Sequence, residues 1–356
     1  MEAFSESSSA LNVQELIKNS LTSIPSCYIR PHNGNESQIV SAADDEGIPT
    51  INLKCLIHGG EEASQIELQK LHYACMEWGL FQLVEHGISK EMLGNLNEEI
   101  QEFFKLPLEE KLKLKIREGE VEGYGTVILS ENQTLDWGDR LYMLTNPLHK
   151  RKPHLFPHIP KSLRSVLESY IVECDNVAMR IVEVIGKALK IERDELEKVY
   201  EDGTQAMRMT YYPPCPEPDQ VLGQAPHSDG SGITIINEVN GVKGLEIKRN
   251  GIWIPVNVTS GALVVNVGDI LEVMSNGAYK SVEHRVTVNS EKERMSLAMF
   301  FLPKFECEIG PALSLTNPHN PPLFKRVTMD KYFKDVSARK FHGKSRLEHM
   351  KITTTT

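Results

Sequence analysis

The chain has 356 residues, of which 40% are hydrophobic and 25% are charged, and its formal net charge is -10. This length and composition are typical of a globular protein with one large or two ordinary domains and a sizeable core. The acidic balance argues against a nucleic-acid partner, because nucleic acids are bound by clustered Lys and Arg.

The first residues, MEAFSESSSALN, are polar and rich in serine. They lack the basic and apolar regions of a secretory signal, and no run approaches the roughly 18 apolar residues of a membrane helix. We therefore predict a cytoplasmic protein without a membrane partner. Widely spaced cysteines without a CxxC pair favour reduced thiols over disulfides or a zinc cluster. They are Cys27, Cys55, Cys75, Cys174, Cys215 and Cys307.

The first half of the chain predicts alternating helices and strands. Residues 1–47 are expected to be flexible apart from a short helix at 13–17, capped by Asn12. A long packing helix is expected within 161–200, at about 162–191, because its apolar residues recur in steps of three and four. Within the α/β region 48–160 we expect strands at 48–53 and 80–84 and helices at 67–78 and 90–106.

Short β-rich runs separated by turns follow from about Ala206. Asn250-Gly251 and Asn276-Gly277 are typical of hairpin turns, since both residue types tolerate positive φ. Many short strands favour a sandwich or barrel within 201–305, and residues 306–356 are predicted to be partly helical. The expected strands are 207–212, 233–239, 244–248, 252–256, 262–267, 269–274, 281–288 and 294–301.

The stretch APHSDGSG holds His227 and Asp229 one residue apart. In extended chain, residues i and i+2 project to the same face, so both side chains could bind one ion. His284 is expected on a later strand. Two imidazoles and one carboxylate form the facial triad of non-haem Fe(II) oxygenases, which leaves three coordination positions open. Taken singly, each histidine also fits an ordinary surface or strand residue.

A candidate carboxylate clamp follows His284 in the sequence. Arg294 and Ser296 are expected to face the same way along one strand, and an arginine fork beside a hydroxyl suits a carboxylate. The alternative for Arg294 is a surface ion pair with Glu291 or Glu293. A metal triad together with such a clamp is a far more specific pattern than either alone.

Residues from about 45 to 345 resemble the plant 2-oxoglutarate- and Fe(II)-dependent dioxygenases, and most of all their senescence-related and alkaloid O-demethylase-like branch. The resemblance covers nearly the whole chain, and its set of motifs is highly specific. It is carried by IPTINL, ACMEWGLFQLVEHGI, FFKLPLEEK, VEGYG, LDWGDRLYML, RKPHLFP, MRMTYYPPCPEPDQVLG, HSDGSG, ALVVNVGDILEVMSNGAYKSVEHRV and RMSLAMF.

The resemblance implies an α+β fold, with a double-stranded β-helix (jelly-roll) core and a helical N-terminal region packed around it. It implies hydroxylation or O- or N-demethylation of a hydrophobic specialised plant metabolite, using Fe(II), 2-oxoglutarate and O2, with release of succinate and CO2. Ascorbate is expected to support sustained activity, and the protein is expected to be a monomer. The alternatives are a non-oxidative condensation enzyme and a metabolite-binding protein on the same scaffold.

The resemblance also assigns roles to individual residues. His227, Asp229 and His284 would bind iron and act in catalysis, while Arg294, Ser296, Tyr212 and Thr210 would bind 2-oxoglutarate. The chain departs from the family pattern at four positions. The family usually has Asn where this chain has Thr210 and Glu85, Asp where it has Asn52, and an apolar residue where it has Asn237. The residues expected to line an apolar substrate pocket, each of which could instead be ordinary core, are Tyr142, Leu141, Phe300, Leu302 and Tyr124.

Overall fold

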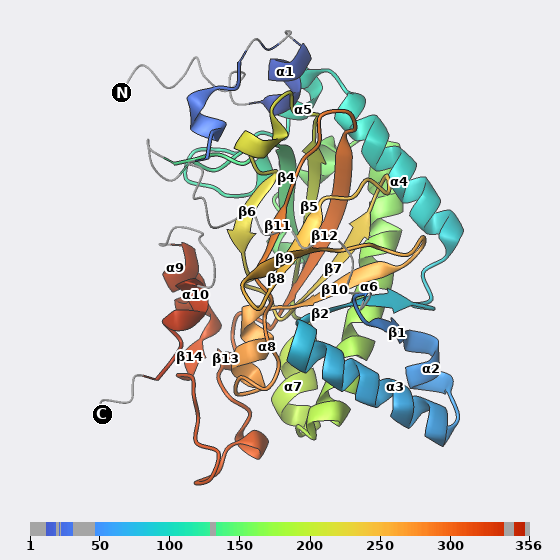
Figure 1. Ribbon diagram of the computed structural model, residues 1–356, viewed down its shortest axis with the longest axis vertical. Helices are drawn as coiled ribbons and strands as arrows, with labels where there is room; N and C mark the ends of the chain where they lie inside the picture. The colour runs from blue at the N-terminus through green and yellow to red at the C-terminus, as the bar shows by residue number, and fades with distance from the viewer. Residues whose placement is uncertain are drawn as a thin grey trace.

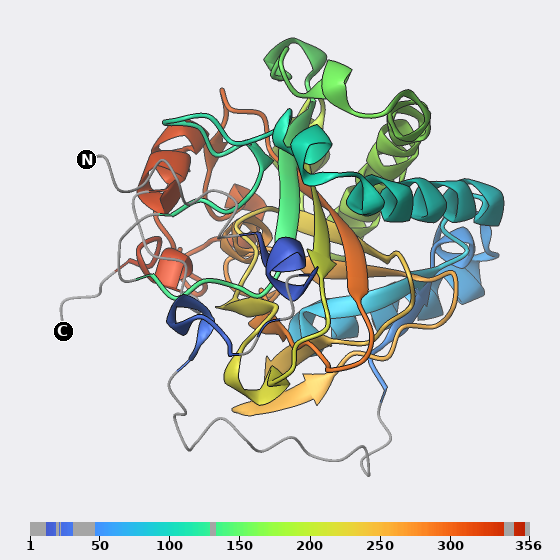
Figure 2. The ribbon, with the colours of Figure 1, turned by 90° about the horizontal axis from the view of Figure 1, so that it is seen from above.

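A computed structural model describes residues 12–18, 21, 23–30, 47–128, 133–337 and 345–352. Residues 1–11 and 31–46, for which flexible chain is predicted, lie outside this description. Two β-sheets form the centre of the molecule, and helices cover the outer face of the larger one (Figure 1, Figure 2). No helix among the described residues is long and apolar enough to cross a membrane.

The N-terminal helices begin at recognisable caps. Asn12 accepts the N–H of Glu15 over 3.0 Å, as predicted for the first helix. The third helix continues as a π-helix, η2, and ends where Gly79 takes a left-handed conformation. The elements are α1 (Val13–Lys18), η1 (Ser26–Tyr28), α2 (Leu53–His58), α3 (Glu61–Tyr73), η2 (Ala74–Trp78), α4 (Lys90–Lys105), α5 (Leu108–Leu112), η3 (Leu148–Lys150) and η4 (Phe156–His158).

The larger sheet has eight strands in the order β1-β2-β10-β7-β12-β5-β4-β3. All neighbours are antiparallel except β1 and β2, which are parallel. The strands are β1 (Thr50–Asn52), β2 (Leu80–Val84), β3 (Gly123–Tyr124), β4 (Asp139–Asn146), β5 (Thr204–Tyr212), β7 (Ile233–Glu238), β10 (Leu263–Val267) and β12 (Arg294–Leu302).

The smaller sheet packs against one face of the larger and completes the predicted jelly roll. Its strands run in the order β6-β11-β8-β9, with β6 at Gln224–His227, β11 at His284–Val286, β8 at Leu245–Arg249 and β9 at Ile252–Pro255. Alternate residues of the larger sheet divide between its two sides. Ile236 and Ala298 contact the small sheet, whereas Ile235 and Leu297 join the core beneath the helices.

The long predicted helix is α6 (Lys161–Leu189), which packs against α3 and α4 behind the larger sheet (Figure 1). It ends where Lys190 adopts a left-handed conformation, so the following residues form a separate helix, α7 (Arg193–Tyr200). The remaining elements are η5 (Pro218–Gln220), β13 (Glu308–Ile309), η6 (Leu313–Leu315), β14 (Val327–Thr328), α9 (Met329–Ser337) and α10 (Ser345–Glu348).

One predicted strand is wrong. Residues 269–274 form a buried helix, α8 (Asp269–Met274). Its apolar residues occupy i, i+1, i+3 and i+4, and acidic side chains in the first turn favour a helix N-terminus. Asn276-Gly277 therefore follows a helix and joins no hairpin. Asn250-Gly251 does connect β8 to β9, with both φ angles positive, as predicted.

Candidate active site

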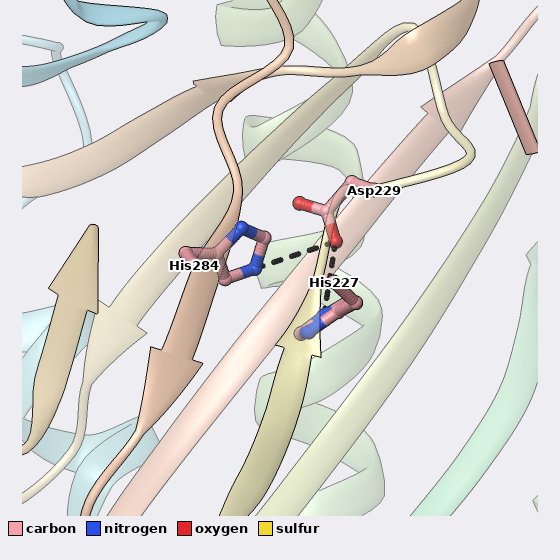
Figure 3. Close-up of side chains that lie close together, drawn as sticks. All are labelled: His227, Asp229 and His284. Carbon is pink, nitrogen blue, oxygen red and sulfur yellow. Dashed lines mark ion pairs between the residues drawn. The ribbon is translucent and has the colours of Figure 1, made fainter. Parts of the chain in front are cut away.

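Two neighbouring strands of the small sheet bring the three predicted metal ligands together (Figure 3). β6 ends at His227, and Asp229 lies two residues further along the chain. β11 begins at His284, which is the direct antiparallel partner of His227. Strand register therefore supplies the contact between ligands that are remote in sequence.

The three side chains converge on one point. Nε2 of His227 and Nε2 of His284 each lie 3.7 Å from Oδ1 of Asp229 (Figure 3). The two imidazole centroids are 4.2 Å apart. One ligand atom from each residue lies within 4.8 Å of the others, and no second group of this kind occurs among the described residues. All three residues are at least nine-tenths buried.

Backbone carbonyls select which nitrogen of each imidazole faces this point. Nδ1 of His227 lies 2.8 Å from the carbonyl oxygen of Ala225, and Nδ1 of His284 lies 3.2 Å from that of Val282. A proton on each Nδ1 satisfies these carbonyls and leaves each Nε2 as an acceptor. This second set of contacts is the usual way in which a protein orients metal-binding histidines.

Electrostatics favour the protonation states that bind a metal. Burial alone would raise the pKa of Asp229, but the neighbouring imidazoles of His284 and His227 outweigh it and hold that pKa below its ordinary value. Burial and the nearby His284 lower the pKa of His227 well below its ordinary value. Asn266 donates to Oδ2 of Asp229 over 3.2 Å, so Oδ1 remains directed at the imidazoles. Ionised carboxylate and neutral imidazole are the metal-binding forms.

A buried carboxylate connects the two ligand segments. Asp269 accepts hydrogen bonds from Ser228 over 3.1 Å and from Ser281 over 2.6 Å, and its own backbone N–H donates to the carbonyl of Asp229 over 2.8 Å. Ser228 lies between the first two ligands, and Ser281 lies three residues before His284. The helix that replaces the predicted strand at 269–274 thus holds both segments in place.

The predicted carboxylate clamp lies on the face of the larger sheet that packs against the small sheet. Arg294 pairs with Tyr212 across β12 and β5, and Ser296 pairs with Thr210. Nη2 of Arg294 lies 3.3 Å from Oε1 of Glu238, while Nε and Nη1 are buried without a hydrogen-bond partner. Because an unpaired buried donor costs about 1–3 kcal/mol or more when charged, this arrangement suits an incoming carboxylate.

Two glycines leave room for the clamp side chains. A Cβ on Gly244 would lie 2.9 Å from Cδ of Arg294, and one on Gly223 would lie 2.7 Å from Cδ1 of Tyr212. The guanidinium carbon of Arg294 is 5.3 Å from the Tyr212 ring centroid. Arg294 is only 2% exposed, which excludes the surface ion pair left open by the sequence.

The residues predicted to line the pocket fall on both sides of the larger sheet. The rings of Tyr142 and Phe300 lie edge to face, 6.4 Å apart, on the clamp side. Leu141 and Tyr124 are cross-strand partners on the opposite side and belong to the core beneath the helices, as does Leu302 at the end of β12. The predicted pocket role of these three residues is corrected. Leu141 lies away from the clamp because it is adjacent to Tyr142 in β4, and adjacent strand residues point to opposite faces. Leu302 alternates in phase with Phe300 but joins the same core at the end of β12.

Two polar residues that the sequence analysis missed lie beside the triad. Arg208 alternates with Thr210 and Tyr212 along β5 and donates to Oε1 of Gln224 over 2.9 Å. The amide of Gln224 in turn lies 3.0 Å from Nε2 of His227. The two-residue period in MRMTYY would have placed Arg208 on the clamp face, whereas nothing in the sequence singles out Gln224.

A cavity of about 340 Å³ lies near the start of β5, and none of the predicted pocket residues lines it. Four of its lining residues are lysine, aspartate or glutamate, which does not fit the expected apolar pocket. The lining residues are Pro147, His149, Lys150, Asp202, Thr204, Lys304, Phe305 and Glu306.

Comparison with known proteins identifies the family. A model of the 2OG-Fe(II) oxygenase superfamily matches residues 203–303, and a model of the non-haem dioxygenase in morphine synthesis N-terminal region matches residues 48–159. Codeine O-demethylase of Papaver somniferum is 46% identical over 344 residues, which cover 96% of each chain. The chain belongs to the 2OG-Fe(II) oxygenase superfamily.

Two further comparisons agree with this assignment. Oxoglutarate-dependent flavonoid 7-O-demethylase 1 of Ocimum basilicum is 41% identical to this oxygenase, over 96% of the chain and 91% of the relative. The chain in a crystal structure of JOX2 in complex with 2OG, Fe and JA is 33% identical in sequence to this chain. The two structures match with a TM-score of 0.85 over 96% of this chain and 98% of that chain. The predicted jelly-roll fold and oxidoreductase class are confirmed.

This oxygenase therefore uses Fe(II) and 2-oxoglutarate, and the residues present fit both. The triad offers the two nitrogens and one oxygen of a facial Fe(II) site, and Arg294 offers unpaired buried donors to a carboxylate. When bound, iron and 2-oxoglutarate supply with O2 an oxidant for a C–H bond of a small molecule. The protein orients these groups and shields them from water.

Three departures from the family pattern have local structural roles. Asn52 caps α2 by accepting the N–H of Cys55 over 2.8 Å, which an aspartate would also do. Glu85 has a φ of 50°, where an asparagine is more commonly tolerated. Asn237 donates to Oδ1 of Asn97 over 2.7 Å on the helical side of the sheet. All three lie outside the triad and the clamp.

Proposed function

We propose that this oxygenase removes an O-methyl group from a flat aromatic plant metabolite. The observation that carries the proposal is the edge-to-face pair of Tyr142 and Phe300 on the clamp side of the sheet. Such a surface suits an aromatic ligand. Two O-demethylases, one named for codeine and one for flavonoids, are 46% and 41% identical to the chain.

The proposed reaction hydroxylates the methyl carbon. Of the two oxygen atoms in O2, one goes to succinate as 2-oxoglutarate loses CO2, and the other forms the hydroxyl group on the methyl carbon. The resulting hemiacetal breaks its bond between that carbon and the aryl oxygen, so the products are formaldehyde and a phenol. The aromatic pair determines which C–H bond is presented, and His227, Asp229 and His284 would hold the iron. Arg294, Ser296, Tyr212 and Thr210 would hold the cosubstrate.

A panel of methoxylated alkaloids and flavonoids tests this function. We expect one phenol, one formaldehyde and one succinate per turnover, measured by mass spectrometry and an aldehyde assay, and no product without O2. A ring-hydroxylated product without formaldehyde would show an oxygenase that does not demethylate. Product without succinate would contradict the proposal and favour non-oxidative chemistry.

We also propose that the protein is a cytoplasmic monomer whose sustained turnover needs ascorbate. All six cysteines are free thiols, which supports a reducing compartment. Light scattering of the purified protein tests whether it is a monomer. Turnover with and without ascorbate tests whether ascorbate is needed. The proposed catalytic core is formed by residues 201–305. The region 48–160 and the helical segment 161–200 are proposed to pack around this core.

A further inference from the structure

A contact from the loop before β4 reaches the metal centre. Nδ1 of His227 lies 2.8 Å from the carbonyl oxygen of Ala225, and the backbone N–H of Ala225 donates to Oδ1 of Asp136 over 2.9 Å. Asp136 therefore holds the residue whose carbonyl orients the His227 ring. The metal centre as described above does not include Asp136.

The place of Ala225 in the small sheet gives this contact its importance. Among the described strands, β6 forms one edge of that sheet, so the outer side of β6 lacks a neighbouring strand. The residue after Ala225 is Pro226, which has no N–H group. The N–H of Ala225 is thus the only backbone donor between Gln224 and His227. Asp136 supplies the acceptor that a neighbouring strand would otherwise provide.

The backbone on both sides of Asp136 is fixed. Leu135 and Trp137 are buried. The N–H of Leu135 donates to the carbonyl of Cys27 over 2.7 Å, and the N–H of Trp137 donates to the carbonyl of Leu222 over 2.8 Å. The carboxylate between them is therefore held at a defined position beside the segment that leads into β6.

Two guanidinium groups contact the same carboxylate. Nη2 of Arg30 lies 2.8 Å from Oδ1 of Asp136, and Nη2 of Arg140 lies 3.4 Å from Oδ2. The backbone N–H of Arg30 also donates to the carbonyl of Gln220 over 2.9 Å. Arg30 thus shares Oδ1 with the N–H of Ala225, and a charged hydrogen bond restrains the direction of that oxygen.

We propose that Asp136 is a positioning residue for the iron site, which holds Ala225 so that His227 presents Nε2 to the metal, and that Arg30 supports this contact. The inference rests on the proposed function, in which His227 is an iron ligand. Arg30 lies outside both residue ranges that the family models match, so the N-terminal segment contributes to the metal centre. The competing explanation is that Asp136 only anchors this segment.

Asp139 offers a matched control, because it anchors the same segment at another point. Its carboxylate accepts the N–H groups of Val13 and Gln14 in α1. Titration with Mn(II), with the free ion followed by electron paramagnetic resonance, measures metal affinity without turnover. We expect Asp136→Ala to weaken Mn(II) binding about 10- to 100-fold, as is usual for residues that support a metal ligand. Asp139→Ala should lower the Tm and leave the Mn(II) affinity unchanged.

A conservative variant and a spectrum separate positioning from anchoring. Asp136→Asn keeps an acceptor for the N–H of Ala225, so we expect it to weaken Mn(II) binding only about 3- to 10-fold, because a neutral hydrogen bond has roughly half the strength of a charged one. In the Co(II)-loaded protein, Asp136→Ala should change the d–d absorption bands, since a turned His227 ring alters the ligand geometry. Asp139→Ala should give the wild-type spectrum.

Arg30→Met tests the supporting role of the guanidinium group. We expect it to weaken Mn(II) binding less than Asp136→Ala does, because the N–H of Ala225 keeps its acceptor. Added to Asp136→Ala, it should cause no further loss, since Arg30 acts through Asp136. Losses that multiply in the double variant would overturn the role given to Arg30.

Unchanged Mn(II) affinity in Asp136→Ala, or equal weakening in Asp136→Ala and Asp139→Ala, overturns the proposal. If Asp136→Ala does not fold, Asp136→Asn and Arg30→Met decide, and wild-type affinity in both overturns it. Failure of the proposed iron site is distinguishable from these results. In that case His227→Ala binds Mn(II) as tightly as the wild type does.

Discussion

His227 and His284 are direct partners across the antiparallel strands β6 and β11, with ring centroids 4.2 Å apart. Their contact depends on strand register, because a slip of one residue would turn the side chain of His284 to the other face of the sheet. The geometry of the metal centre is therefore set by the same backbone pairing that holds the small sheet together.

We expect His284→Ala to lower Fe(II) affinity by more than about 100-fold, since even residues that only support metal ligands contribute 10- to 100-fold. Fe(II) content after gel filtration and release of labelled CO2 from 2-oxoglutarate measure the effect. His319→Ala, at an exposed position, is the control and should retain both. Normal iron content in the His284 variant would contradict the assigned site.

Replacing Arg294 by Lys removes the fork but keeps the charge. We expect the KM for 2-oxoglutarate to rise about 10- to 100-fold, because two buried guanidinium donors lose their geometry. Fe(II) affinity should not change, since Arg294 contacts none of the three ligands. Ser296→Ala should give a smaller rise, as expected for one neutral hydrogen bond. An unchanged KM in both variants would refute the clamp.

Thr210 is buried opposite Ser296 and lacks the amide that the family usually has at this position. We expect Thr210→Asn to lower the KM for 2-oxoglutarate about two- to tenfold by adding one donor. Thr204→Asn, further along the same face of β5, should leave the KM unchanged. A raised KM with a lower Tm would mean that the larger side chain overpacks the site.

Phe300 and Leu141 lie on opposite faces of the larger sheet, so their truncation should have different effects. Phe300→Ala is expected to weaken substrate binding at least about tenfold while 2-oxoglutarate is still consumed, which separate product and succinate assays detect. Leu141→Ala should instead lower the free energy of unfolding by about 2–5 kcal/mol, measured by urea titration. Reversal of these two results would invalidate the assignment of faces.

The stability of the protein should also depend on Asp139, which is 4% exposed and accepts the N–H groups of Val13 and Gln14 at the start of α1. Burial raises the pKa of Asp139 from 3.8 to about 6, although these hydrogen bonds and Lys111 oppose the rise. The folded state therefore binds the proton more tightly than the unfolded state does. The stabilisation of the folded state that comes from protonating Asp139 is complete below about pH 4. This stabilisation is lost as pH rises through 6.

An Asp139→Asn variant checks this dependence, because it cannot titrate. Between pH 4.5 and pH 7.5 we expect the wild type to lose about 2 kcal/mol of unfolding free energy relative to the variant. Urea titrations at several pH values measure the difference. A difference that stays constant with pH would exclude the shifted pKa.

The sequence predicted the features that depend on residue type and local period. The fold class, α6 and the hairpin at Asn250 are confirmed, and the structure brings His227 beside His284 and Arg294 beside Tyr212. It failed where the result depends on register between strands. The cross-strand contact of Leu141 with Tyr124 needed the pairing of β4 with β3, and the contact of Gln224 with His227 needed the folded backbone.

The iron ligands and the carboxylate clamp belong to different layers. His227 and His284 lie on the four-stranded sheet, and Arg294 and Tyr212 lie on the eight-stranded sheet. A cosubstrate that reaches from the metal to Arg294 therefore spans the interface of the sandwich. Iron and 2-oxoglutarate together should oppose separation of the two layers, so heat inactivation should slow more with both present than the sum of their separate effects.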